Sequence, residues 1–233
     1  MIIHRSESRG VADHGWLKSR HTFSFGDYYN PQRMSFGALR VINDDSVEAG
    51  RGFGTHPHKD MEIISIPLEG SLRHKDSEGN SSVICQGEVQ IMSAGTGIFH
   101  SEFNASEAEV VKFLQIWVLP EKTGVKPRYE QKDFSHVECL NKIVTVVSPD
   151  GREGSVRINQ NAFFSLTEIE ANKKVIYKRR SPGNGLYVFM LKGQVELNGV
   201  VLNPRDGAGV SEFDSISLQA LEQSEILLME VPL

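Results

Sequence analysis

The sequence has little cysteine and no long apolar run. Its two cysteines, Cys85 and Cys139, are too few and too far apart for a disulfide scaffold or a zinc ribbon. No stretch approaches the roughly 20 apolar residues that a membrane-spanning helix needs. The first seven residues lack the apolar core and cleavage site of a signal peptide. We therefore expect a cytoplasmic protein that makes no contact with a membrane.

An excess of positive charge is also absent. The 233 residues include 25 Lys and Arg against 30 Asp and Glu, which gives a formal net charge of −5. Nucleic-acid binding requires a basic face that neutralises phosphates. The only dense basic run, residues 173–180, is typical of a solvated charged face. We expect no direct nucleic-acid partner.

Helical periodicity is missing over any long stretch. Short segments rich in Val, Ile, Leu and aromatic residues alternate with Gly, Asp, Asn and Pro, which indicates an all-β sandwich or barrel. The expected strands are 36–42, 61–68, 71–74, 88–92, 112–118, 186–191, 193–198, 215–221 and 225–231. Residues 76–80 and the pair Asn198-Gly199 are predicted hairpin turns. The segment 120–127 contains glycine and prolines, and it predicts a boundary between two similar β modules, 1–130 and 131–233.

The histidines are unevenly distributed. All eight, at positions 4, 14, 21, 56, 58, 74, 100 and 136, precede the strands of the second module, so only the first module is expected to build a nitrogen-rich metal site. His56 and His58 follow a glycine-rich segment, residues 50–54. On a strand, residues i and i+2 share a face, so both imidazoles can bind one ion. Pro57 cannot donate to a β-ladder, which predicts a strand at an edge or a rim.

His100 and Glu102 form a second pair with the same spacing. Two strands that each present two ligands would leave open coordination positions on a divalent ion, which suits catalysis or sensing. Glu62 is an alternative carboxylate ligand. Spacing alone does not choose between Glu62 and Glu102. Residues 59–60 can interrupt the strand and change which face of the sheet the Glu62 side chain occupies. The remaining histidines are expected to have no metal role.

Other catalytic motifs fail on their context. The glycines at positions 50, 52 and 54 match part of a dinucleotide fingerprint, but His-Pro-His follows where a helix must begin. Residues 56–60 begin like the His-x-His-x-Asp-His signature of metallo-β-lactamase-type hydrolases, but Met61 replaces the next histidine. No Gly-x-Ser-x-Gly elbow is present, so nucleophilic acyl chemistry is not indicated.

The two histidine-containing stretches resemble the two motifs of the cupin superfamily. The matches to the first motif, with one extra residue before the last glycine, are Gly50, His56, His58, Glu62 and Gly70. The matches to the second are Gly87, Gly97, His100 and Asn104, with Ser93-Ala94-Gly95 where Pro-x-Gly is usual. Within the cupins the chain is similar to the pirin family from residue 14 to about residue 130. The stretches that carry this likeness are 14–17, 21–25, 36–45, 56–58 and 95–102.

This resemblance implies two tandem cupin barrels of the double-stranded β-helix, or jelly-roll, type, the second without metal. The N-terminal barrel would hold one divalent transition metal, Fe(II) before others, through His56, His58, His100 and Glu102. Glu62 would lie outside the ligand set. The implied activity is that of an O2-dependent oxidoreductase, a quercetin 2,3-dioxygenase that cleaves flavonols and releases CO. Glu102 would then be a catalytic residue, as ligand and as base for the flavonol 3-hydroxyl.

Two functions compete on this basis. The dioxygenase needs an apolar pocket over the metal. The aromatic and apolar candidates for its walls are Phe53, Met92, Phe99 and Phe103. The alternative is a redox-sensing or regulatory protein whose metal alters a surface that binds a protein partner, as the eukaryotic relatives suggest. The basic residues available for such a surface are Lys59, Arg73 and Lys75.

Overall fold

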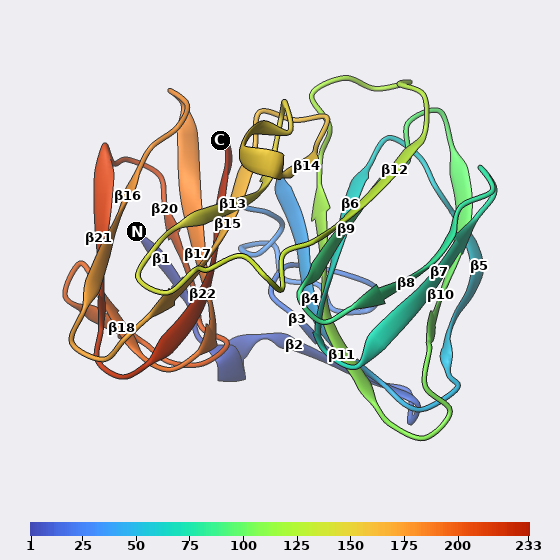
Figure 1. Ribbon diagram of the computed structural model, residues 1–233, viewed down its shortest axis with the longest axis horizontal. Helices are drawn as coiled ribbons and strands as arrows, with labels where there is room; N and C mark the ends of the chain where they lie inside the picture. Colours follow the sequence, from blue (N-terminus) through green and yellow to red (C-terminus); the bar gives the residue numbers. More distant parts are fainter. The chain divides into compact units, whose positions relative to one another are not determined.

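The computed structural model describes all residues from Met1 to Leu233, and nearly all regular structure in it is antiparallel β-sheet (Figure 1). The prediction of an all-β fold is confirmed. None of its helices has the length and apolar character that crossing a membrane requires. The chain divides into two compact units. The N-terminal unit comprises Gly10–His136 and Val156–Gln160, and the C-terminal unit comprises Met1–Arg9, Val137–Ser155 and Asn161–Leu233.

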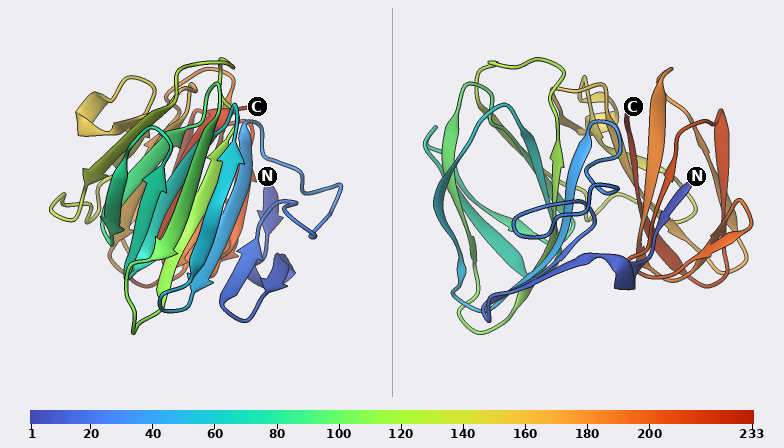
Figure 2. Two further views of the ribbon diagram at one scale, coloured as in Figure 1. Left: turned by 90° about the vertical axis from the view of Figure 1, so that its right-hand side faces the viewer. Right: turned by 180° about the vertical axis from the view of Figure 1, so that it is seen from behind.

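The N-terminal unit contains two sheets, which are visible as two layers of strands in Figure 2. The larger has the order β12-β9-β6-β11-β4-β3-β2 and the smaller the order β5-β10-β7-β8. The strands of the larger sheet are β2 (Gly10–Asp13), β3 (Leu17–His21), β4 (Leu39–Val47), β6 (Glu62–Glu69), β9 (Glu88–Ser93), β11 (Val111–Val118) and β12 (Arg128–Asp133). Those of the smaller sheet are β5 (Gly52–His58), β7 (Ser71–Asp76), β8 (Ser81–Cys85) and β10 (Ile98–Asn104). The short β14 (Val156–Arg157) also belongs to this unit.

The C-terminal unit repeats this two-sheet plan. Its larger sheet has the order β1-β20-β17-β22-β15-β13, and its smaller sheet the order β16-β21-β18-β19. The strands of the larger sheet are β1 (Ile2–His4), β13 (Val144–Ser148), β15 (Phe163–Ile169), β17 (Asn184–Lys192), β20 (Gly207–Val210) and β22 (Ser224–Pro232). Those of the smaller are β16 (Lys174–Lys178), β18 (Val195–Leu197), β19 (Val200–Leu202) and β21 (Ser215–Ala220). Two short 3-10 helices are η1 (Ser6–Ser8) and η2 (Arg152–Gly154).

Both predicted hairpins are present. Residues 77–80 connect β7 to β8, and Asn198-Gly199 connects β18 to β19. The φ angles of Asn198 and Gly199 are 51° and 78°, the left-handed values that a two-residue hairpin turn requires and that these residue types tolerate. The predicted strand 36–42 starts later, at Leu39, because the chain makes a tight turn between Phe36 and Leu39 with Gly37 at φ 53°.

The first nine residues group with the C-terminal unit, whereas the sequence-based division 1–130 and 131–233 assigns them to the first module. Strand β1 pairs antiparallel with β20. The ring nitrogen Nδ1 of His4 lies 2.8 Å from the hydroxyl of Tyr187, and Arg5 donates to the buried carboxylate of Asp206 at 2.6 Å. A pairing between strands more than two hundred residues apart leaves no local signal in the sequence. One histidine, His4, therefore lies in the C-terminal unit.

The interior of the N-terminal unit has a polar layer between two apolar clusters. One cluster contains Leu17, Val47, Leu72, Ile84, Val111 and Phe113, and the other contains Ile63, Met92, Ala94 and Ile98. Between them, directly paired residues form a polar row across β3, β4, β11, β6, β9 and β12. This row, here called the polar belt, consists of His21, Asn43, Gln115, Ser65, Gln90 and Gln131.

The C-terminal unit has a continuous apolar core instead. Alternate residues of β17 and β22, such as Val188 and Leu228, pack with Leu218 of β21 and their neighbours in a single cluster. The buried carboxylate of Glu230 accepts hydrogen bonds from the hydroxyl of Tyr177 and from Asn184. This buried carboxylate is therefore paired within the protein, while the polar belt of the N-terminal unit lines an interior that can hold a ligand.

A chain that begins at Gly10 tests the assignment of the first nine residues. It lacks the β1 pairing and the Arg5–Asp206 ion pair, so the melting temperature of the C-terminal unit should fall by on the order of 10 °C. Amide hydrogen exchange of β20 should lose its protection. The matched control is Glu7→Ala, which changes an exposed residue of the same segment and should have little effect. Unchanged exchange of β20 in the shortened chain would contradict the assignment.

Candidate metal centre

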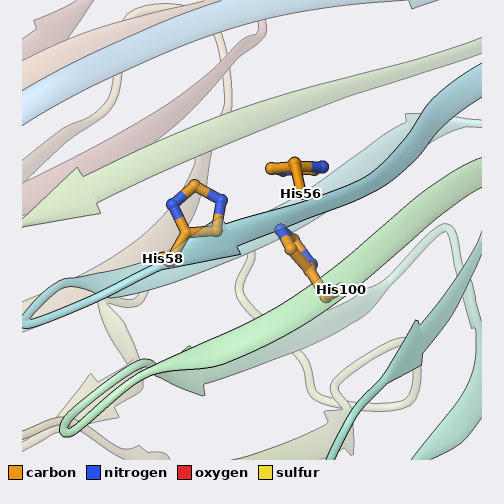
Figure 3. A group of neighbouring side chains, drawn as sticks. All are labelled: His56, His58 and His100. Carbon is orange, nitrogen blue, oxygen red and sulfur yellow. The ribbon is translucent and has the colours of Figure 1, made fainter.

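The predicted histidines converge because β5 and β10 are neighbours in the smaller sheet. His56 lies directly opposite His100 in this antiparallel pair, and His58 lies two residues further along β5 on the same face. Figure 3 shows the imidazoles of His56 and His58 on one strand and that of His100 on the next, all directed toward a common point. Strand β5 is the edge of its sheet and Pro57 is exposed, as the sequence predicted.

The three imidazoles are close enough to share one ion. Their ring centroids are 4.4 to 4.8 Å apart, and one nitrogen from each lies within 4.8 Å of the others. Nδ1 of His56 lies 2.7 Å from the carbonyl oxygen of Gly54. Because a carbonyl only accepts, Nδ1 carries the proton and donates, which leaves Nε2 as the nitrogen with a free lone pair. This is how a second hydrogen bond usually orients a metal-binding histidine.

His100 provides the test of fit for a metal. It is buried, and neither of its ring nitrogens has a hydrogen-bond partner, although buried polar groups are rarely left unpaired. Burial, with the neighbouring histidines as a smaller cause, holds the pKa of His100 well below its usual value. Burial also lowers the pKa of His58, to about 4. Both imidazoles are therefore neutral at pH 7, the form that binds metals. The donor set fits a divalent transition metal.

Glu102 lies beside this cluster on β10. Its carboxylate accepts hydrogen bonds from Ser65 at 3.1 Å and from Gln115 at 2.6 Å, both in the polar belt. Burial raises the pKa of Glu102 to about 7. Its ligand atoms group closely with those of His100 and His74, whereas the His56, His58 and His100 group forms without it. The structure thus brings three of the four predicted ligands together and places Glu102 next to one of them.

The alternative carboxylate, Glu62, lies in a different environment. The chain turns at Asp60, where φ is 48°, and Glu62 begins the next strand, β6. The Oε2 atom of Glu62 accepts hydrogen bonds from Ser93 at 2.7 Å and from the backbone of Asn159 at 3.1 Å. Glu62 belongs to neither group of side chains that can hold a metal.

Several residues around the candidate metal centre were not predicted from the sequence. His74, which was expected to have no metal role, is buried on β7 with its ring centroid 5.3 Å from that of His100. Its Nε2 atom lies 3.0 Å from the carboxylate of Asp76. The available signal was the alternation of Leu72 and His74 with the charged Arg73 and Lys75, which places His74 on the face of the apolar Leu72. No sequence pattern identified Gln115 or Ser65 as part of the site, since a single polar residue in a strand belongs to no recognisable motif.

A cavity of about 560 Å³ opens next to the imidazoles, a size that suits a drug-sized ligand. Its aromatic walls include Phe25, Phe53 and Trp117, and the ring of Trp117 stacks edge-on against His58 at 4.9 Å. The prediction that Phe99 and Phe103 line the pocket is wrong. Both are exposed, because they alternate along β10 with the inward-facing His100 and Glu102.

The other two predicted wall residues have separate outcomes. Phe53 lines the cavity, as predicted. Met92 does not, because it packs in the apolar cluster with Ile63 and Ile98 on the other side of the polar belt. The pocket is lined by residues of β2, β3, β4, β5, β10 and β11 and by residues 25–28. Only part of this lining was predicted from the sequence.

Comparison with known proteins gives matches over the full chain. The family model described as Pirin matches residues 4–118, and the one described as Quercetinase C-terminal cupin domain matches residues 145–231. Quercetin 2,3-dioxygenase of Escherichia coli (strain K12) is 45% identical over 236 residues, which cover 100% of this chain and 99% of the relative. The Pirin-like protein of Caulobacter vibrioides is 40% identical and covers 95% of each chain.

Solved structures agree with this assignment. The bacterial pirin YhhW of Escherichia coli, solved in complex with nickel(II), superposes with a TM-score of 0.94 at 44% identity and covers 99% of this chain and 98% of its own. A quercetin 2,3-dioxygenase structure from Acinetobacter baumannii has a TM-score of 0.80 at 19% identity, covers 100% of this chain and 86% of its own, and shows the common fold alone. The two-barrel cupin architecture and the full-length similarity lead to one conclusion: the chain is a member of the pirin family.

Proposed function

We propose that this protein is a metal-dependent dioxygenase that cleaves flavonols such as quercetin with release of CO. The observation that carries the proposal is the buried, unpartnered imidazole of His100 facing His56 and His58 beside a cavity with aromatic walls. The name of the 45% identical relative, quercetin 2,3-dioxygenase, supports the same substrate class. Dioxygen is the second substrate of such a reaction.

We propose Fe(II) as the metal, held by His56, His58, His100 and Glu102. Imidazoles with a carboxylate are a ligand set typical of non-haem iron, although nickel(II) is the ion in the solved bacterial relative. When bound, such an ion supplies Lewis-acid and one-electron chemistry toward O2 and an enolate. Three neutral imidazoles and one carboxylate leave the centre with net positive charge, which favours an anionic substrate.

The chain's own residues would bind the flavonol and remove its proton. The aromatic side chains Phe25, Phe53 and Trp117 would pack against the flat rings and exclude water from them. Glu102 would accept the proton of the 3-hydroxyl at a carboxylate oxygen. The hydrogen bonds from Ser65 and Gln115 hold this buried carboxyl group in place beside the imidazoles. Gln115 orients it through the hydrogen bond to Oε2.

Gln115 in turn is held by Trp117. The indole Nε1 atom of Trp117 donates to Oε1 of Gln115 at 3.1 Å. This bond fixes which end of the Gln115 amide faces Glu102, so that the nitrogen donates to the carboxylate. The cavity wall and the carboxylate are thereby parts of one hydrogen-bonded chain, and we infer that packing of a ligand against Trp117 and orientation of Glu102 depend on each other.

The competing role, a regulatory protein with a redox-active metal, has one observation in its favour. Phe99 and Phe103 are exposed on the outer face of β10, the strand that carries His100 and Glu102, and Arg73 lies opposite Phe103 on β7. A partner protein bound there would contact the back of a ligand-bearing strand. The dioxygenase stands first because the cavity on the inner face is formed and has a suitable size.

Oxygen uptake with CO release tests the proposed activity. Fe(II)-reconstituted protein should consume O2 and release CO when quercetin is added. The His56→Ala/His58→Ala double variant should bind no iron and show no turnover, because two of three imidazoles are gone. The matched control is His136→Ala, which removes a histidine whose side chain is 93% exposed and should leave turnover unchanged. Protein with verified bound iron and no turnover of quercetin would overturn the proposal and favour the regulatory role.

Glu102→Gln tests the role of the carboxylate. The amide keeps the size of the side chain but is a poor base and a weaker metal ligand. We expect kcat for quercetin to fall by about 10²–10⁴-fold, and iron to bind more weakly in equilibrium dialysis. Glu62→Gln is the comparison, because Glu62 lies outside the groups that can hold a metal, and it should retain iron binding. Iron affinity and turnover that both stay at wild-type level in Glu102→Gln would show the assignment to be wrong.

A further inference from the structure

The cavity has a second polar region that the metal centre does not use. Its lining includes His56, His58 and Glu102 on one side, and it also includes Asn43 and Asp45 of β4. Along a strand, residues two apart are separated by roughly 7 Å and share a face. Asn43 lies in the polar belt opposite Gln115, and Asp45 lies one step further from that belt, opposite Phe113. Asp45 also lies opposite Ser19 of β3, and both residues line the cavity.

Asp45 is a buried carboxyl group with an incomplete set of partners. Its side chain is only 4% exposed, and its Oδ1 atom has no hydrogen-bond partner. Its one favourable side-chain contact is the hydrogen bond from Ser19. A buried polar atom without a partner is costly and rare. Because Asp45 also lines the cavity, its carboxyl group is a candidate acceptor for a hydroxyl group of a ligand.

The surroundings of Asp45 are fixed by a short hydrogen-bonded chain. Nδ1 of His21 lies 2.8 Å from Oδ1 of Asn43 and 3.3 Å from the hydroxyl of Ser19. Since the amide oxygen only accepts, His21 donates from Nδ1. The hydroxyl of Ser19 is then available to donate to Asp45. The residues that position Asp45 thus lie on β3 and β4 and do not include a metal ligand.

We propose that Asp45 binds a hydroxyl group of the substrate, remote from the group that faces the metal. This inference rests on the proposed function and narrows its substrate class. The preferred ligand is an aromatic compound that carries an enol at one end and at least one further phenolic hydroxyl at the other. The hydroxyl donates to the carboxylate of Asp45, while the rings between the two ends contact Phe53 and Trp117.

Equilibrium binding under argon tests this proposal without turnover. Two probes are compared on Fe(II)-loaded protein by calorimetry: quercetin, and 3-hydroxyflavone, which keeps the 3-hydroxyl and 4-carbonyl groups but lacks the other hydroxyls. One hydrogen bond to a carboxylate corresponds to about tenfold in Kd. We expect the wild type to prefer quercetin by about that factor, and Asp45→Leu to bind both probes with similar Kd values.

Two further variants control for loss of structure. Asp45→Asn keeps an acceptor oxygen and should retain part of the preference for quercetin. Asp44→Leu removes the neighbouring carboxylate, which does not line this cavity, and should keep the full preference. An unchanged preference in Asp45→Leu would overturn the proposal, and so would a preference that Asp44→Leu abolishes equally.

The outcomes also separate this inference from the proposed function. If the preference depends on Asp45 but quercetin is bound without O2 consumption, the hydroxyl site stands and the dioxygenase activity is contradicted. If quercetin is cleaved and the preference does not depend on Asp45, only the hydroxyl site is contradicted. If neither flavonol binds to the wild type, both are contradicted.

Discussion

The need to satisfy polar groups inside a small β-barrel governs the N-terminal unit. A row of polar residues crosses its larger sheet between two apolar clusters, and His100 and Glu102 project from the facing sheet toward that row. Such an interior is costly when its polar groups lack partners, as His100 does in both ring nitrogens. The metal ion and the hydroxylated substrate that we propose would be partners that remove this cost. The polar belt interrupts the apolar core, and it is also the part of the interior that faces the candidate metal ligands.

The two units share one architecture, but only the N-terminal unit has the polar belt in its interior. In the C-terminal unit the corresponding interior is one apolar cluster, and its buried Glu230 is fully engaged by the Tyr177 hydroxyl, Asn184 and backbone amides. Both groups of side chains able to hold a metal lie in the N-terminal unit. The single histidine of the C-terminal unit, His4, contacts Tyr187. A duplicated fold thus carries two different interiors.

Much of this arrangement was predictable from local patterns. The i, i+2 spacing of His56 and His58, and of His100 and Glu102, predicted two adjacent ligand-bearing strands, since side-chain alternation is a property of any strand. The same alternation, applied to β10, would have excluded Phe99 and Phe103 from the pocket. Contacts between distant strands were not predictable in this way. The pairing of β1 with β20, the position of His74 beside His100, and the hydrogen bond from Gln115 to Glu102 all depend on register across sheets.

The most direct test of this account is to locate the metal by anomalous diffraction at the iron edge in crystals of Fe(II)-loaded protein. The account predicts one peak per chain, about 2 Å from a nitrogen of His56, His58 and His100 and from a carboxylate oxygen of Glu102. A peak bound by His74 in place of His56 and His58, or one with no carboxylate oxygen among its ligands, would contradict it.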